Sequence, residues 1–178
     1  IAQNMKRNNA LKGNAAVVTQ MSNEALIDYL NVLGMETHRT QIGDRYVFEK
    51  MRAVGSNLGG ENSGHVILGD YASTGDGMVA ALQVLGHLIE SGKKLSEIAR
   101  PFELYPQILK NVKFKKENPL EDKKILDGIT DIQKSTGNAA RILVRKSGTE
   151  KLIRIMVEAR DKQKITNLAK DIESIITG

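Results

Sequence analysis

The stretch "AAVVTQMSNEALIDYLNVLGMETHRT", residues 15–40, decides the fold class of this chain. It opens with a short run rich in β-branched residues at 15–20, which is typical of a strand. Apolar residues recur at helical spacing over 23–34, and Gly34 suits the C-terminal end of that helix. A second strand is predicted at 35–41. Because strand and helix alternate, the sequence predicts an α/β layered domain.

The same alternation continues toward the middle of the chain. Residues 42–55 predict a tight turn followed by a helix, and residues 57–70 predict two short strands around a glycine-rich loop. Residues 73–92 show a long apolar pattern with Asp76 as the expected N-cap. We expect this helix to cover the sheet.

A second domain is predicted beyond residue 110, after prolines at 101 and 106 interrupt the pattern. There a strand and a helix precede two strands that a short turn joins, and a last helix follows. Such strands pair antiparallel, because a parallel pair needs a crossover of about a dozen residues. The sequence therefore predicts a small α+β domain with an antiparallel sheet. The predicted divisions are a tail of a preceding domain at 1–12, the α/β domain at 13–110 and the α+β domain at 111–178.

Composition excludes several classes of protein. No apolar run approaches the roughly 20 residues of a membrane-spanning helix, so we predict no membrane partner. The absence of cysteine excludes disulfides and thiolate metal sites, and it favours a cytoplasmic location. The net charge of +5 comes from interspersed charges of both signs, as on an ordinary solvated surface. Because the chain opens at Ile1 without a signal-peptide pattern, we expect a piece of a longer protein.

The predicted hairpin loop "RKSGTEKLIR", residues 145–154, has the contents of a phosphate site. Arg145 offers a planar fork for two oxygens, Ser147 and Thr149 offer hydroxyl donors, and Gly148 lets backbone N–H groups turn inward. The alternative is an ordinary tight hairpin with Arg145 and Arg154 in solvent. The residues alone leave both interpretations open.

The loop "GGENSGHVIL", residues 59–68, suggests a polyol site. In an extended segment Glu61, Ser63 and His65 would point to the same side, where a carboxylate and a hydroxyl suit neighbouring sugar hydroxyls. His65 could equally be a structural histidine. One carboxylate and one imidazole fall short of a metal ligand set, so no metal is predicted here.

Asp44 and Arg45 stand at the turn before the helix predicted within 42–55. Taken alone, they are most simply a helix cap and a surface arginine.

Five motifs, in this order, resemble the C-terminal part of bacterial phosphoglucosamine mutases, within the α-D-phosphohexomutase superfamily. They are "GDRYVFEKM", "GGENSGHVIL", "STGDGMVAALQVL", "YPQILKNV" and "VRKSGTEKLIRIMVEA". The resemblance implies the third and fourth domains of a four-domain enzyme. That family interconverts glucosamine 6-phosphate and glucosamine 1-phosphate through a phosphoserine of the first domain and a bisphosphorylated sugar. Magnesium is held by an Asp-rich loop of the second domain.

The resemblance also implies roles for individual residues. Glu61, Ser63 and His65 match the sugar-binding loop, in which Asn62 replaces the more usual Gln. Asp44 and Arg45 become candidate contributors to the active cleft. The phosphate-binding loop is matched by Arg145, Ser147, Gly148, Thr149 and, more weakly, Arg154. Because the serine and metal loops do not occur in these residues, we expect this chain alone to bind a phosphosugar without turnover. Its other expected partner is the missing N-terminal part of the enzyme, and a homodimer is left open.

Three competing functions are weighed against this one. The sibling activities, phosphomannomutase and phosphoglucomutase, use the same scaffold with another sugar loop. A phosphosugar sensor without chemistry is a second alternative. A nucleic-acid-binding module is disfavoured, because aromatic residues make up only 4% of the chain and no basic stripe is interleaved with stacking residues.

Overall fold

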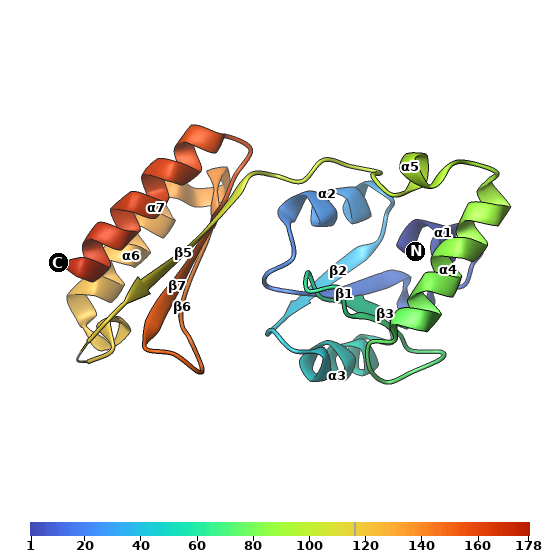
Figure 1. Ribbon diagram of the computed structural model, residues 1–178, viewed down its shortest axis with the longest axis horizontal. Helices are drawn as coiled ribbons and strands as arrows, with labels where there is room; N and C mark the ends of the chain where they lie inside the picture. The colour runs from blue at the N-terminus through green and yellow to red at the C-terminus, as the bar shows by residue number, and fades with distance from the viewer. Residues whose placement is uncertain (116) are drawn as a thin grey trace. The chain divides into compact units, whose positions relative to one another are not determined.

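The computed structural model describes residues 1–115 and 117–178, which form two compact units, Ile1–Leu104 and Tyr105–Gly178 (Figure 1). The predicted boundary near residue 110 lies within strand β5 (Gln107–Lys113). The predicted tail at 1–12 contains helix α1 (Ala2–Arg7), and its apolar side chains pack against the core of the first unit.

The first unit is built on a four-stranded mixed sheet with the order β2-β1-β3-β4. Strand β1 (Ala15–Thr19) runs parallel to both β2 (Glu36–Thr40) and β3 (Leu58–Gly60), whereas β4 (Val66–Leu68) is antiparallel to β3. Every residue of β1 is buried. This is expected of an inner strand that is covered on both faces.

Two helices cover the two faces of this sheet (Figure 1). Helix α2 (Glu24–Val32) packs its Leu30 against the face that contains Ala16. Helix α3 (Asp44–Val54) packs Val47 and Met51 against the face that contains Val17. The predicted α/β layered fold is thereby confirmed.

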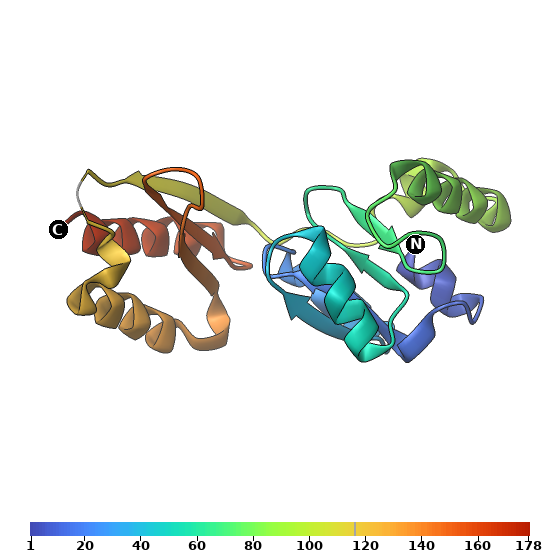
Figure 2. The same ribbon diagram turned by 90° about the horizontal axis from the view of Figure 1, so that it is seen from below.

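Helix α4 (Gly77–Ser91) begins where the sequence predicts, because the Asp76 side chain accepts hydrogen bonds from two backbone N–H groups of its first turn. The prediction that it covers the sheet is wrong. Helix α4, all of whose residues are described, buries none of them and lies beside β4 (Figure 2). Its exposed apolar side chains are Met78, Leu82, Leu85 and Ile89. The partly buried Val79 of α4 packs against the core on the α2 face, while the helix lies along the edge strand β4.

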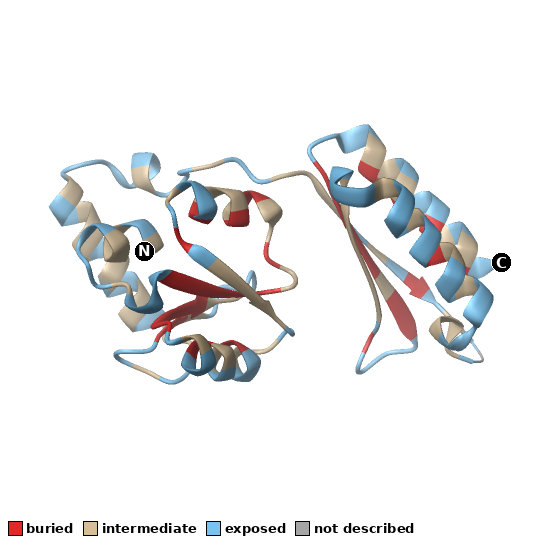
Figure 3. Cartoon of the chain, turned by 180° about the vertical axis from the view of Figure 1, so that it is seen from behind, coloured by how far each residue is buried: buried red, intermediate tan, exposed pale blue. Residues whose placement is uncertain are grey.

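The second unit is a two-layer α+β domain, as predicted. Its antiparallel sheet has the order β5-β7-β6, with β6 at Arg141–Lys146 and β7 at Leu152–Glu158. Helices α6 (Lys123–Thr136) and α7 (Lys162–Thr177) pack against one face of it. The core contains Ile153, Ile155, Val157, Ile129, Ile165 and Ile172. The buried residues are concentrated on the inner strands β1 and β7 and on the inner sides of the helices (Figure 3).

The remaining helical elements are short. They are the four-residue helix α5 (Leu95–Ile98) and the 3-10 turns Lys12–Asn14, Pro119–Glu121 and Gly137–Ala139. Among the described residues, no helix combines the length and the apolar character that a membrane crossing needs.

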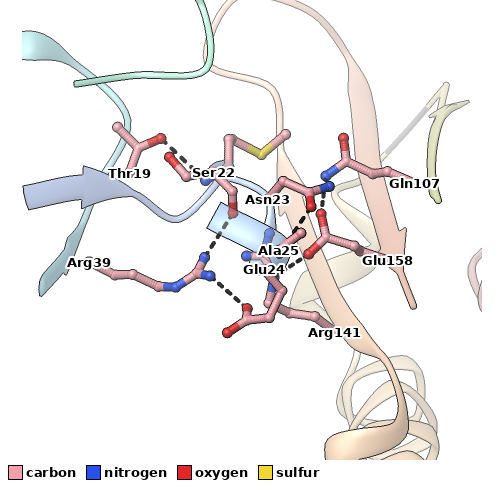
Figure 4. Close-up of polar contacts among 10 residues, drawn as sticks. Thr19, Ser22, Asn23, Glu24, Ala25, Arg39, Gln107, Arg141 and Glu158 are labelled. Carbon is pink, nitrogen blue, oxygen red and sulfur yellow. Dashed lines mark hydrogen bonds and ion pairs between the residues drawn. The ribbon is translucent and has the colours of Figure 1, made fainter. Parts of the chain in front are cut away.

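Charged side chains tie elements together within each unit (Figure 4). In the first unit Arg39 of β2 donates to Glu24 of α2 over 2.6 Å. In the second unit the carboxylate of Glu158, which is 1% exposed, accepts from Gln107 at 2.9 Å and from Arg141 at 3.2 Å. The buried charge therefore has hydrogen-bonded partners on both neighbouring strands, as a buried carboxylate requires.

Candidate functional site

The loop between β3 and β4 is a tight hairpin turn. The Glu61 N–H donates to the His65 carbonyl at 2.9 Å, and the Gly64 N–H donates to the Glu61 carbonyl at 3.1 Å. Gly64 has a φ of 99°, a conformation that a side chain would strain. The expectation of an extended segment is therefore wrong, because the chain reverses direction within these five residues.

The turn nevertheless brings the three predicted side chains together. The Ser63 Oγ lies 3.3 Å from Glu61 Oε2 and 3.1 Å from His65 Nδ1. His65 Nδ1 lies 3.9 Å from the same Glu61 oxygen. The Glu61 side chain is 9% exposed and that of His65 is 56% exposed. A carboxylate, a hydroxyl and an imidazole thus form one cluster that can both donate hydrogen bonds to sugar hydroxyls and accept them.

Glu61 is also tied to the start of α3. Its second oxygen, Oε1, accepts the Gly43 N–H at 2.6 Å. Gly43 is the N-cap residue of that helix, where free N–H groups and the helix dipole favour a negative charge. The carboxylate therefore holds its place in the hairpin and stabilises the helix at once.

Asp44 and Arg45 play different parts from those that a simple cap implies. The N-cap is Gly43, and Asp44 is the first helical residue. Asp44 Oδ2 accepts the Thr74 hydroxyl at 2.7 Å, and its Oδ1 accepts the Arg45 N–H at 2.7 Å. These two hydrogen bonds, that of Thr74 first, lower the pKa of Asp44. The Arg45 guanidinium extends along the helix to Glu49 at 2.8 Å.

A hollow of about 300 Å³ lies between the hairpin and the start of α4. This is at the lower end of the volumes found for ligand pockets. Gly75 forms part of its wall, and a Cβ added there would lie 3.1 Å from the Cβ of His65. The two segments therefore pack so closely that a side chain at this position would have little room. The lining residues are Ser63, Gly64, His65, Val66, Gly75, Asp76 and Gly77.

The second candidate loop joins β6 to β7, and it presents two arginines side by side. Arg145 and Arg154 are direct partners across the two strands. Ile153 and Ile155 point into the core beneath α6 and α7, so alternation places both arginines on the other face of the sheet. Like charges directly opposite each other destabilise a strand pair. A bound anion would relieve that repulsion.

The environment of the two arginines also favours an anion. Burial, and to a lesser degree the charge of Arg154, lower the pKa of Arg145. The Arg154 Nη2 lies 3.4 Å from Glu150 Oε2, while its Nε is buried and has no hydrogen-bond partner among the described residues. A buried donor without an acceptor costs about 1–3 kcal/mol. The rest of the Arg154 side chain is partly exposed, and that part is accessible to an anion.

The hairpin tip carries the remaining predicted residues. Ser147 is buried, and its N–H closes the hairpin by donating to the Leu152 carbonyl at 2.9 Å. Gly148 and Thr149 are exposed. A Cβ at Gly148 would meet no atom within 4 Å, and its φ lies outside the left-handed region, so this conformation does not itself require glycine.

The sequence matches two neighbouring domain families. Residues 1–105 match the family described as phosphoglucomutase/phosphomannomutase, alpha/beta/alpha domain III. Residues 109–175 match the phosphoglucomutase/phosphomannomutase C-terminal domain. This chain belongs to the phosphoglucomutase/phosphomannomutase family. The resemblance found in the sequence motifs is thus confirmed.

Relatives within the phosphoglucomutase/phosphomannomutase family include two named phosphoglucosamine mutase. The protein from Zymomonas mobilis is 48% identical over 172 residues, and that from Parvibaculum lavamentivorans is 46% identical over 176 residues. These matches cover 97% and 99% of this chain but only 39% of each relative. The chain therefore spans about two fifths of the length of these relatives.

Solved structures of the same fold share little sequence with this chain. The Aspergillus fumigatus N-acetylphosphoglucosamine mutase, in complex with GlcNAc-6P and magnesium, has a TM-score of 0.76 at 18% identity. The match covers 98% of this chain and 44% of that protein. A phosphoglucomutase/phosphomannomutase family protein from Burkholderia thailandensis has a TM-score of 0.74 at 18% identity, over 99% of this chain and 39% of that protein. At these identities the likeness supports the fold alone.

The resemblance assigns magnesium to a loop outside these residues. The described part of this chain contains no set of side chains that could bind it. No group of three or more His, Asp or Glu side chains there could hold a metal ion. Two carboxylates near the hollow are instead engaged by hydrogen-bond donors, Glu61 by Gly43 and Asp44 by Thr74.

Thr74 and Gly43 were missed as members of the site by reasoning from the sequence. Thr74 belongs to "STGDG", which indicates only the start of a helix, and Gly43 reads as part of a turn. Their partners lie 30 and 18 residues away in the chain. No local pattern carries a signal for such pairs.

Proposed function

We propose that this chain is the sugar-binding and phosphate-binding part of a phosphoglucosamine mutase. Such an enzyme interconverts glucosamine 6-phosphate and glucosamine 1-phosphate. The observation that carries the proposal is the pair of arginines at 145 and 154, which lie directly opposite each other on neighbouring strands and are only partly buried. The names of the relatives and the cluster of Glu61, Ser63 and His65 support the amino sugar as the rest of the ligand.

Each loop has its own task in this proposal. Arg145 and Arg154 hold the phosphate that is not transferred, because a planar guanidinium can donate two parallel hydrogen bonds to it. Ser147, Gly148 and Thr149 complete the phosphate loop with hydroxyl and backbone donors. In the other loop Glu61, Ser63 and His65 bind sugar hydroxyls.

Binding by these loops suits the chemistry of phosphoryl transfer, which depends mainly on positioning and on electrostatic stabilisation. Magnesium, which the resemblance assigns to a loop outside this chain, would neutralise charge on the transferred phosphoryl group. Neither Asp44 nor Arg45 is assigned a chemical step.

The proposal also names partners and a compartment. We infer a phosphosugar and the other domains of the same enzyme as partners, and a cytoplasmic location, where a chain without cysteine needs no disulfides. Whether the full-length enzyme forms a homodimer is a separate question, which sedimentation of the full-length protein would answer.

A second candidate is the sibling activity on glucose or mannose phosphates. It is favoured by the family itself, whose description names phosphoglucomutase and phosphomannomutase. The same arginine pair could bind the phosphate of any of these substrates. The residues that distinguish one substrate from another must therefore be those that contact the sugar.

The test is an NMR titration of the 178-residue chain with glucosamine 6-phosphate, mannose 6-phosphate and inorganic phosphate. We expect shifts at 145–154 with all three ligands and larger shifts at 61–65 with the amino sugar. Larger shifts at 61–65 with mannose 6-phosphate would favour the sibling activity. No shift at 145–154 with any ligand would refute the phosphate site.

A matched pair of variants sharpens this test. Arg145→Ala should weaken the binding that the shifts at 145–154 report by about 1.5–3 kcal/mol, so that the titration moves to higher ligand concentration. Lys146→Ala removes one positive charge from the adjacent position, whose side chain points to the opposite side of the strand. It should leave phosphate binding within about twofold of the original, as expected for an exposed charge without direct contact.

A further inference from the structure

The start of α3 forms hydrogen bonds with both segments that line the hollow. One segment is the hairpin turn at 61–65, called the sugar hairpin below, and the other is the segment that leads into α4. On one side Gly43 donates its N–H to Glu61 of the hairpin at 2.6 Å. On the other side Asp44 accepts the hydroxyl of Thr74, in the segment that leads into α4, at 2.7 Å. Two consecutive residues thus fasten two segments that are distant in the sequence.

The segment around Thr74 is attached to the first unit at few points. The Asp76 N–H donates to the Val66 carbonyl of β4, over a rather long 3.3 Å. Tyr71 and Ala72 donate their N–H groups to the Leu68 carbonyl, and Thr74 adds a side-chain tether to Asp44. Gly75 lies between the attachments of Thr74 and Asp76. Its position is therefore set by the Thr74 hydroxyl on one side and by a weak backbone bond on the other.

Gly75 in turn determines where His65 can lie. A Cβ built on Gly75 would be 3.1, 3.2 and 3.3 Å from the Cβ, Cδ2 and Cα of His65. Such a close approach leaves His65 little room to move toward α4. Displacement of Gly75 would release the imidazole from this side, while Ser63 would still hold it from the other at 3.1 Å.

We propose that Asp44 and Thr74 are positioning residues for the sugar hairpin, because their hydrogen bond holds Gly75 against His65 and so sets the width of the hollow. The bond is charge-assisted, since the hydrogen bonds to Asp44 keep its carboxyl group ionised. Neither residue needs to touch the ligand. The effect of this hydrogen bond on the position of the hairpin is argued from geometry alone. Its effect on sugar binding rests on the proposed function.

The experiment compares three threonine variants of the 178-residue chain. Thr74→Val keeps the shape and removes the hydroxyl, whereas Thr74→Ser keeps the hydroxyl. Thr130→Val is the matched control, because Thr130 in α6 also donates one exposed hydroxyl bond, to the Leu126 carbonyl at 2.7 Å. Hydrogen exchange without ligand measures protection of the Asp76 and Glu61 N–H groups, and a titration with glucosamine 6-phosphate measures affinity.

We expect Thr74→Val to lower the protection of the Asp76 N–H about tenfold and to weaken glucosamine 6-phosphate binding by about three- to tenfold, the scale of one lost hydrogen bond. Protection of the β1 amides should not change. Thr74→Ser should restore both quantities to within about twofold, and Thr130→Val should alter neither.

Several results would overturn the inference. Unchanged Asp76 protection in Thr74→Val would show that the bond does not hold this segment. A loss of protection throughout β1 would make Thr74 a general determinant of stability. Asp44→Asn, which keeps the shape of the side chain but weakens the bond by removing its charge, must then show a loss confined to 61–76. If the unchanged chain does not bind glucosamine 6-phosphate, the proposed function fails, and the exchange data still decide whether Thr74 positions the hairpin.

Discussion

Gly59 is a residue at which one added methyl group should strongly destabilise the first unit. It lies at the centre of β3, where it pairs with Val17 of β1 and with Ile67 of β4. The hairpin turn begins two residues later, at Glu61. A Cβ there would lie 2.5 Å from Val47 Cγ1 and 2.5 Å from Met51 Sδ. Both side chains belong to α3 and are at most 1% exposed.

The magnitude follows from which neighbour can move. Met51 is flexible and can turn its sulfur aside at little cost. Val47 cannot, because a β-branched residue in a helix has one strongly preferred rotamer. Helix α3 must therefore shift away from the sheet. Overpacking of a core typically costs about 1–3 kcal/mol, and we expect Gly59→Ala to lower the free energy of unfolding of the first unit by about 2–3 kcal/mol.

A second glycine provides a control of opposite sign. Gly86 is in the interior of α4, and a Cβ added there would meet no atom within 4 Å. Gly86→Ala should therefore stabilise the protein by about 0.5–1 kcal/mol through the better helix propensity of alanine. The two variants make the same chemical change, so their difference isolates the clash.

The assay is native-state hydrogen exchange, read at Val17 for the first unit and at Ile155 for the second. Gly59→Ala should reduce protection at Val17 and leave Ile155 unchanged. Adding Val47→Ala should recover part of the loss, because it removes the Cγ1 atom that clashes. A loss at Val17 of less than about 0.5 kcal/mol, or no recovery with Val47→Ala, would refute the packing argument.

Three further changes test other parts of the molecule. Arg145→Ala should weaken the binding of glucosamine 6-phosphate by about 1.5–3 kcal/mol, the scale of a hydrogen bond to a charged group, and calorimetry that finds equal affinities would remove Arg145 from the site. Hydrogen bonds from Lys12 and Asn57 lower the pKa of Asp70, so its carboxylate stabilises the fold above the unfolded pKa of about 3.9, and this contribution is lost as the pH falls through the lower folded value. Urea unfolding should therefore show that Asp70→Asn lowers stability near neutral pH but not at about pH 2, and equal losses at both pH values would contradict the reasoning. Ile172 is fully buried beneath the sheet of the second unit, and Ile172→Ala should cost about 2–5 kcal/mol in exchange protection there, with no change at Val17.

Much of the fold could be predicted because its signals are local. The strand at 15–20 and the helix at 23–34 follow from the residues they contain, and Asp76 caps α4 by bonding N–H groups only two and three residues away. The hairpin at 145–154 could also be predicted, because two strands joined by a short turn can pair only in the antiparallel direction. Propensity, capping and short turns all act over a few residues.

The candidate site was predictable only in its list of residues. Glu61, Ser63 and His65 lie close together, in a turn and not along the extended segment that the sequence suggested, and their role in binding stays a prediction. The bond from Gly43 to Glu61 and that from Thr74 to Asp44 were beyond prediction, because the packing of α3 against the sheet brings these partners together.

The sequence by itself therefore determined which segments of this chain are strands and helices, where α4 begins, and which two loops contain clusters of polar residues. Only the tertiary structure decided that α2 and α3 take the two faces of the first sheet and leave α4 at its edge, and that the start of α3 holds the sugar hairpin. The physical reason is the distance along the chain over which each kind of interaction acts. Backbone propensity and capping depend on neighbours in the chain, whereas the choice of a buried face, and every contact across 18 or 30 residues, depends on how the whole core packs.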